Sequence, residues 1–403
     1  KISISKESIF SAAFFNPAKL PFTGISNGIG FNYNIFKLNI DLNDNRSEEN
    51  KQNFIIDSPK KEQSNIYGYY FGFTIPIFDT ENYGLSLGML YYNPENDVAK
   101  INIFDEKYFQ YYKFHSDIQT ISMNAGLGFK FFKNFGLGLG VSQLVSVEGS
   151  TQVMFKYDDV NGSEITGKDL FLGVVNERSY NFSVYGEIKD FSFGIIYKQA
   201  LKLPYKIPAQ IILKNFNGDG KDATLDILIA GTGVWIPPKL NLGLSYDFKK
   251  INTIISSDIN YEFWSKAPNP YSYTILNSDA VLLKVDELES YKGSIIFSNT
   301  INFSFGIEKK FENFDIFGGF QYKPSVIKSH GKTVNYLDND LYGISGGFSY
   351  KISKLLNNTR DLYINFSYAF IIAENTKEYS KYYNSDVDYN GVIQTVFFDL
   401  SIK

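Results

Sequence analysis

Residues 118–131, IQTISMNAGLGFKF, decide the fold because their side chains alternate between two kinds. The apolar face would carry Ile121, Met123, Ala125, Leu127, Phe129 and Phe131. The other face would carry Thr120, Ser122, Asn124, Gly126, Gly128 and Lys130. A period of two over more than about ten residues predicts a β-strand with one apolar face. Such a strand exceeds the about five or six residues usual in a sandwich and suits the about nine to eleven that cross a membrane.

The same alternation recurs along the whole chain. We expect fourteen strands, at residues 25–42, 65–79, 83–93, 118–132, 135–149, 179–189, 191–203, 236–248, 251–266, 297–309, 313–324, 340–353, 361–374 and 391–402. Their connections alternate between long loops (43–64, 94–117, 150–178, 204–235, 267–296, 325–339, 375–390) and short turns (80–82, 133–134, Asp190, 249–250, 310–312, 354–360). A transmembrane barrel predicts this asymmetry, whereas a soluble sandwich gives no reason for it.

Composition supports the barrel and excludes several other classes of protein. The chain has 403 residues, with 30 Tyr, 37 Phe and 32 Gly, and it has no linker-like tract. No run of about 18 apolar residues predicts a membrane-spanning helix. The net charge of −4 argues against a nucleic-acid partner, and the absence of Cys excludes a disulfide scaffold and thiolate metal sites. We therefore predict an all-β protein, a fourteen-stranded antiparallel transmembrane barrel.

Residues 1–24 precede the first predicted strand and do not alternate. Pro17 and Pro21 prevent regular helix or strand there, and Phe14, Phe15 and Leu20 are apolar. Because a barrel of fourteen strands encloses more space than its own side chains fill, we expect this piece to lie inside the lumen as a hatch. The alternative is a disordered tail. The expected domains are thus a hatch at 1–24 and a barrel at 25–403.

Several stretches together resemble the FadL-type outer-membrane transporters of long-chain fatty acids and other hydrophobic compounds. AAFFNPAKLPF (12–22) resembles the hatch of that family, with its Asn-Pro-Ala motif at Asn16, Pro17 and Ala18 beside Phe14 and Phe15. Similar strand patterns occur in 191–203, with Lys198 where Arg is common, in 236–266 and in 305–327. The resemblance implies a bacterial outer-membrane monomer with periplasmic termini, surrounded by lipid, that takes up a hydrophobic ligand passively without a cofactor. The alternative is that the protein acts as a surface adhesin or as a secretion-associated binding protein, through its long outer loops, as related barrels can.

Apolar side chains on the inward face are the expected ligand pocket. They are Tyr70, Phe78, Leu90, Tyr92, Leu144, Tyr185, Ile196, Ile254, Phe317, Tyr363 and Phe397, although they could instead pack against the hatch. Inward Lys198, Lys239 and Lys323, near the outer ends of their strands, could bind a carboxylate or pair with lumen acids. His115 and His330 lack a catalytic arrangement, so we predict no enzyme and no metal site.

A lateral exit into the bilayer is expected beside the third strand. Pro76 and Pro94 cannot donate to a strand ladder, and Gly88 allows the wall to bend, with Asn93 next to Pro94. Each proline could equally mark the end of its strand. The resemblance implies an opening at the same strand. Aromatic residues expected at the membrane interfaces, on the outer face, are Tyr67, Phe131, Phe135, Tyr246 and Phe248.

Overall fold

The computed structural model describes residues 11–42, 60–61, 65–94, 108–111, 122–158, 162–213, 223–269, 273–278, 295–330, 334, 336–356, 360–381 and 383–403. Fourteen strands of this part of the chain close into one antiparallel barrel, which confirms the predicted fold class. They are β1 (Ser26–Leu42), β3 (Ile66–Asp79), β4 (Gly84–Pro94), β6 (Ser122–Phe131), β7 (Phe135–Asp158), β8 (Gly162–Ile188), β9 (Phe191–Lys198), β12 (Lys239–Phe248), β13 (Thr253–Glu262), β16 (Thr300–Lys310), β17 (Phe314–Lys323), β20 (Leu341–Leu356), β21 (Arg360–Ser380) and β22 (Ser385–Ile402).

Each barrel strand pairs with the next one along the chain, and the last pairs with the first. The β1–β22 ladder runs without a shift from Asn27 opposite Ile402 to Leu42 opposite Val387. β9 pairs with β12, and β13 pairs with β16, so the segments between them leave the wall and return to it. Closure matters because a complete ring leaves no exposed strand edge in the wall.

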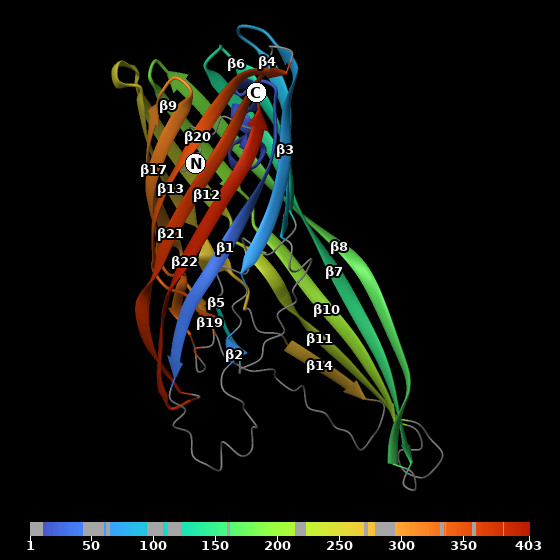
Figure 1. Cartoon of the computed structure of the whole chain (residues 1–403). Helices are drawn as coiled ribbons and strands as arrows, with labels where there is room; N and C mark the ends of the chain where they lie inside the picture. The colour runs from blue at the N-terminus through green and yellow to red at the C-terminus, as the bar shows by residue number, and fades with distance from the viewer. Residues whose placement is uncertain are drawn as a thin grey trace.

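Short turns connect the strands at one end of the barrel, which we call the turn end. They lie at residues 80–83, 132–134, 189–190, 249–252 and 311–313, and the C-terminus labelled in Figure 1 lies in the same half of the barrel. The other end, the loop end, carries the longer connections. Phe132, Lys133, Lys189 and Asn252 adopt positive φ in the turns, a conformation that lets the chain reverse tightly.

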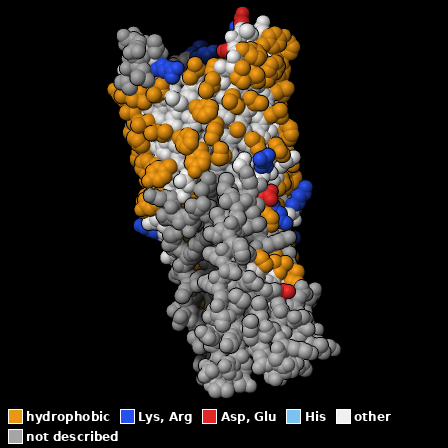
Figure 2. Space-filling model, turned by 90° about the vertical axis from the view of Figure 1, so that its right-hand side faces the viewer, with side chains coloured by type: hydrophobic (Ala, Val, Ile, Leu, Met, Phe, Trp, Pro, Cys, Tyr) orange, Lys and Arg blue, Asp and Glu red, His pale blue; other side chains and the backbone are white. Residues whose placement is uncertain are grey.

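The outer face of the barrel is apolar, as Figure 2 shows over the half nearest the turn end. Leu127 on β6 and Leu139 on β7 are typical, with 44% and 56% of their surfaces exposed. All five expected rim aromatics share this outer face: Tyr67, Phe131, Phe135, Tyr246 and Phe248. The phase inferred from the alternation is therefore correct over these strands.

Two predicted loops are largely strand, and these expectations were wrong. Most of 150–178 belongs to the β7–β8 hairpin, whose ladder continues to Asp158 opposite Gly162. Most of 375–390 belongs to the β21–β22 hairpin, which turns at residues 381–384. Both regions are rich in charged and polar residues, which makes the one-sided apolar pattern by which a strand is recognised shorter and weaker there.

Three further strands extend the sheet beyond the loop end, as Figure 1 shows. They are β10 (Leu201–Leu213), β11 (Ala223–Ile236) and β14 (Tyr273–Ser278), in regions 204–235 and 267–296 that were predicted as loops. β10 pairs in parallel with β7, with Ala209 opposite Thr151. The predicted strand 191–203 is accordingly divided between β9 and β10. Ile236 ends β11, and β12 begins only at Lys239, after two prolines.

Residues 295–299, 324–330, 334 and 336–340 cover part of the loop end. Two small sheets belong to this cover: β15 (Ile296–Phe297) with β18 (Ile327–Ser329), and β19 (Tyr336–Leu337) with β5 (Tyr108–Tyr111), which also pairs with β2 (Lys60–Lys61). The cover packs through Val334 and Leu337 against Tyr389 and Ile393 of β22. Asn339 fastens it by donating hydrogen bonds to the carbonyls of Glu374 and Tyr389, at 2.7 and 3.2 Å.

Candidate functional site

Residues 11–24, which we call the N-terminal segment, form two short helices before β1. Helix α1 (Ala12–Phe15) ends at Asn16, whose extended backbone (φ −160°) lets the chain restart as the 3₁₀ helix η1 (Pro17–Phe22). Pro17 suits the first helical position because its missing N–H has no partner to lose there. Gly24, with φ of +70°, then turns the chain into β1. The described residues contain no strand, as expected, but the expectation that the prolines prevent regular helix was wrong, because both prolines lie within the 3₁₀ helix η1. Residues 1–10 lie outside the described part.

The N-terminal segment packs against five glycines of β4, β6 and β7, which we call the glycine wall. They are Gly88, Gly126, Gly128, Gly136 and Gly138. A Cβ added at Gly128 would lie 2.3 Å from the Pro17 carbonyl oxygen, and one at Gly138 would lie 2.1 Å from the Ala18 nitrogen. These glycines alternate with outward Leu127 and Leu137, so the segment lies on the inner face of the wall. Only glycine permits so close an approach.

Polar and aromatic contacts orient the segment on this wall. The Ala18 nitrogen donates a hydrogen bond to Ser183 Oγ on β8, at 2.9 Å. Phe22 packs against the Tyr185 ring with centroids 5.0 Å apart, and Lys19 Nζ lies 5.1 Å from the same ring. Asn16, Pro17 and Ala18 are buried, so the Asn-Pro-Ala motif faces the wall rather than the open lumen.

At the other side of the segment, Lys198 of β9 reaches the aromatic pair of helix α1. Its Nζ lies 3.5 Å from the Phe14 ring centroid and 6.0 Å from that of Phe15. The two rings meet edge to face at 4.9 Å. A cation over an aromatic face is attracted by the ring quadrupole. Lys198 thus connects the strand wall directly to the N-terminal segment.

The other two predicted lysines also face inward at the loop end. Lys239 is the register partner of Lys198 and forms a 3.1 Å ion pair with Glu262 of β13. Glu262 also accepts hydrogen bonds from Trp264 Nε1 at 2.7 Å and Asn260 Nδ2 at 2.9 Å. Lys323 of β17 contributes a further attractive charge to Glu262. The structure therefore brings the lysines into one region and gives them an acidic neighbour that the sequence prediction did not name.

Two tryptophans that the prediction of a pocket did not include lie beside this group. Trp235 and Trp264 meet edge to face at 5.4 Å, and Trp264 lies 6.2 Å from Phe297. Val326 and Tyr336 complete this buried cluster beneath the cover. The signal available in the sequence was that these are the only two tryptophans of the chain. Trp235 was missed because it belongs to the predicted loop 204–235, whereas Trp264 lies on the inward phase of the predicted strand 251–266 and was not named among the pocket residues.

The residues expected to line the pocket do not form a single group. Eight of them face the interior: Tyr70, Leu90, Tyr92, Tyr185, Ile196, Ile254, Phe317 and Tyr363. Tyr185 and Ile254 are buried towards the turn end, whereas Tyr92 lies towards the loop end near Asn32. Leu144 packs with Leu201 of β10 and Ile236 of β11. Of the remaining inward residues expected, Phe397 faces the lumen, with 36% of its surface exposed.

Phe78 was predicted to face inward, and this was wrong. A bulge between Pro76 and Phe78 inserts Ile77 into β3 and shifts the alternation by one residue. Phe78 consequently points outward, with 45% of its surface exposed, and Asp79 points inward. A one-residue bulge reverses the faces of all residues that follow it in the strand.

The wall beside β4 contains only this one irregularity. β4 pairs with β3 from Gly84 to Pro94 and with β6 from Gly84 to Tyr92. Pro76 lies at the bulge, Pro94 ends β4, and Asn93 is on the outward phase of the strand. Gly88 faces inward, where an added Cβ would lie 2.5 Å from Leu20. The space that would let the wall bend inward at Gly88 is thus occupied by the N-terminal segment.

The inner face opposite the glycine wall is polar near the turn end. Asp361 pairs with Lys351 at 2.7 Å, and Asp399 accepts a hydrogen bond from Asn365 at 2.6 Å. Glu308, Asp315, Asp361 and Asp399 are half-exposed on this face. A hydrophobic molecule that left the lumen at the turn end would therefore pass acidic side chains and water.

Within the described residues, no group of three His, Asp or Glu could hold a metal ion, and no helix is long and apolar enough to cross a membrane. His330 is buried beside Glu378, whereas His115 lies outside the described residues.

No family model and no curated protein match the sequence. Solved structures do match it. A FadL homologue of Pseudomonas aeruginosa superposes with a TM-score of 0.62 at 14% identity, covering 99% of this chain and 94% of that one. The toluene transporter TodX of Pseudomonas putida superposes with a TM-score of 0.54 at 13% identity, covering 99% of this chain and 96% of that one. The monoaromatic hydrocarbon channel CymD superposes with a TM-score of 0.51 at 12% identity, covering 99% of this chain and 94% of that one. The chain therefore has the fold of the FadL-type barrels, as its sequence motifs indicated.

Proposed function

We propose that this protein is an outer-membrane channel for hydrophobic molecules and that long-chain fatty acids are its ligands. The observation that carries the proposal is a closed barrel with an apolar outer face and a buried N-terminal segment on its inner wall. An apolar outer face requires a lipid environment, because so much exposed hydrophobic surface is unfavourable in water. The P. aeruginosa FadL homologue and TodX support the assignment through their shared fold.

The ligand would bind at the loop end, near the tryptophans and the lysines. Trp235, Trp264 and Phe297 supply apolar surface, and Lys198 supplies a cation. A fatty acid has the complementary chemistry, an alkyl chain and a carboxylate, and an ammonium–carboxylate hydrogen bond is among the stronger ones. Residues 1–24 would act as the hatch that separates this site from the turn end, so uptake would require that the hatch move.

We further propose that the ligand leaves sideways into the bilayer beside β4. The bulge at Ile77 weakens the regular pairing of β3, and the acidic inner face near the turn end disfavours an axial exit. Within this proposal both chain termini and all the short turns face the periplasm, and the protein works as a monomer without coupling to an energy source.

Lipid extraction from the purified barrel, followed by mass spectrometry, tests the ligand class. We expect about one fatty acid per barrel, and a Trp264→Ala variant should retain much less. A barrel that carries no lipid and whose tryptophan fluorescence does not respond to added fatty acid would contradict the ligand assignment. Uptake of a toluene-like probe instead would support the channel function and contradict the assignment of fatty acids as the ligands.

A binding role of the extended sheet is the second candidate function. The observation in its favour is that β7, β8, β10, β11 and β14 continue beyond the loop end of the barrel (Figure 1). Such a surface suits an adhesin or a secretion-associated protein. Replacing residues 146–177 by a two-residue turn separates the two functions. We expect that variant to fold and to keep fatty-acid uptake, while any cell-surface adhesion would be lost.

A further inference from the structure

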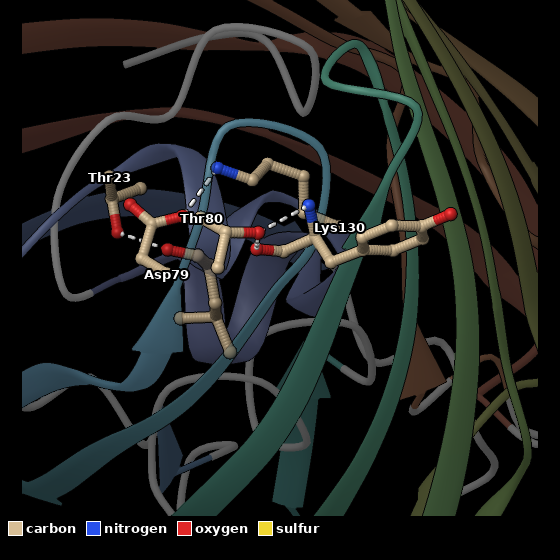
Figure 3. A network of polar contacts seen from close by, with 6 residues as sticks. Thr23, Asp79, Thr80 and Lys130 are labelled. Atoms are coloured by element: carbon tan, nitrogen blue, oxygen red, sulfur yellow. Dashed lines mark hydrogen bonds and ion pairs between the residues drawn. The ribbon is translucent and has the colours of Figure 1, made fainter.

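Three residues at the turn end lie in one row across neighbouring strands. Asp79 of β3 is the register partner of Gly84 of β4, and Gly84 is the register partner of Lys130 of β6. The Lys130 ammonium nevertheless forms an ion pair with the Asp79 carboxylate, and Figure 3 shows the two side chains facing each other. Strands two apart are separated by about 9–10 Å, so this ion pair passes over the inner side of β4.

Gly84 provides the room for the ion pair to cross. A Cβ added there would lie 2.9 Å from Asp79 Oδ1 and 3.2 Å from Lys130 Cε. A side chain at this position would therefore occupy the path between the two charges. The glycine follows a tight turn in which Thr80 Oγ1 hydrogen-bonds to Tyr83, so the backbone that carries it is held in place.

The bulge at Ile77 directs the carboxylate of Asp79 towards the interior. In a regular strand, Asp79 would share the outward phase of Tyr67, Phe71 and Ile75 and would point into the apolar outer face. The bulge shifts the phase by one residue, so that Asp79 points inward to Lys130. The irregularity in β3 and the glycine in β4 thus serve the same contact.

A second ion pair joins the turns that follow β3 and β6, and it provides a comparison. Lys133 and Glu81 lie 3.2 Å apart, but 63% and 76% of their side chains are exposed, so solvent screens them. Only 11% of the Lys130 side chain is exposed, although 53% of the Asp79 side chain is. A buried ammonium needs its counter-charge far more than an exposed one does. Backbone ladders already join these strands, and we expect the Asp79–Lys130 pair to add more to the fixing of their turn end than Lys133–Glu81 does.

We propose that Asp79 and Lys130 form a clasp that keeps the turn end of β4 fixed between β3 and β6, and so sets how readily the wall beside β4 opens. These are positioning residues, since they act on the wall and need not touch the ligand. The clasp itself follows from the contacts above. Its role in transport rests on the proposed lateral exit.

Hydrogen–deuterium exchange of the intact barrel in detergent tests the clasp without any ligand. In Lys130→Met, we expect the amides of residues 84–88 to exchange at least fivefold faster, and in Lys133→Met we expect no change. Gly84→Ala keeps both charges and should accelerate the same amides. The exchanged pair Asp79→Lys with Lys130→Asp should restore slow exchange. Unchanged exchange in both Lys130→Met and Gly84→Ala, or fast exchange in the exchanged pair, would overturn the clasp.

Uptake of a fluorescent fatty acid into liposomes tests the role in transport. We expect Lys130→Met to raise the uptake rate about threefold and the exchanged pair to return it to the original value. Suppose that amide exchange accelerates in Lys130→Met, but that uptake is unchanged both in Lys130→Met and in a barrel with β3 and β4 cross-linked. The clasp would then be supported and the lateral exit would be contradicted. If cross-linking blocks uptake while Lys130→Met leaves exchange unchanged, the lateral exit stands and the clasp fails.

Discussion

At the scale of single residues, the glycine wall makes a prediction about how the N-terminal segment is held. Gly138→Ala places a methyl group 2.1 Å from the Ala18 nitrogen, and backbone cannot give way as a flexible side chain can. We expect a loss of about 1–3 kcal/mol in the free energy of unfolding, as for other overpacked sites. Limited proteolysis should also cut residues 11–24 faster.

The matched control for this variant is Gly346→Ala, in β20. The nearest atom to a Cβ there is 3.8 Å away, which is an ordinary contact. That variant should unfold like the original protein and resist the protease equally. Equal behaviour of the two variants would mean that the segment is not held by its close approach to the wall.

Lys198 makes a second prediction at this scale, about ligand charge. Lys198→Met removes the ammonium that lies over Phe14, while Lys239 keeps its partner Glu262. We expect about tenfold weaker binding of a fatty acid, which corresponds to about 1.4 kcal/mol, and unchanged binding of the alcohol of equal chain length. Calorimetric titration measures both. An equal loss for acid and alcohol would show that Lys198 acts through packing and not through its charge.

At the scale of elements, a disulfide between strands β3 and β4 tests the proposed exit route. Phe73 and Met89 are register partners, and the chain has no cysteine of its own, so Phe73→Cys with Met89→Cys creates one defined disulfide. If the ligand leaves beside β4, the oxidised variant should bind fatty acid normally but transport none, and a reductant should restore uptake. The control bridge joins Phe305 and Phe320 in β16 and β17 and should have no effect. Undiminished uptake in the oxidised β3–β4 variant would exclude this route.

At the scale of the whole molecule, the apolar outer face predicts how the barrel sits in a bilayer. Arginine introduced at outward positions along β6 should lower the free energy of unfolding most in the middle of the strand. We expect a loss of about 2–4 kcal/mol at Leu127 and of about 0–1 kcal/mol near the rim, at Phe131. Equilibrium unfolding from lipid vesicles measures the profile. A flat profile, or one that is highest at Phe131, would place the bilayer elsewhere on the barrel.

The sequence by itself determined the barrel, the number of its strands and, except after the bulge in β3, the phase of the inward residues it named. The alternation in residues 118–131 and its thirteen counterparts is visible because one face meets an apolar environment and the other does not, and that contrast is a local property of each strand. The inward positions of Lys198, Lys239 and Lys323 followed from the same phase. The motif at Asn16, Pro17 and Ala18 likewise indicated a segment outside the strand pattern.

The tertiary structure alone decided what depends on contacts between distant residues. The strands β10, β11 and β14 and the tips of β7, β8, β21 and β22 extend beyond the barrel, and the sequence prediction placed most of these residues in loops. The bulge that turns Asp79 inward depends on its pairing with β4, and the pairing of Lys239 with Glu262 depends on neighbouring strands. The need for glycine at positions 128 and 138 follows only from the backbone of Pro17 and Ala18, which lies against them. In the sequence these residues are more than a hundred positions apart. Local periodicity reports the environment of a side chain, and only the folded chain reports its partner.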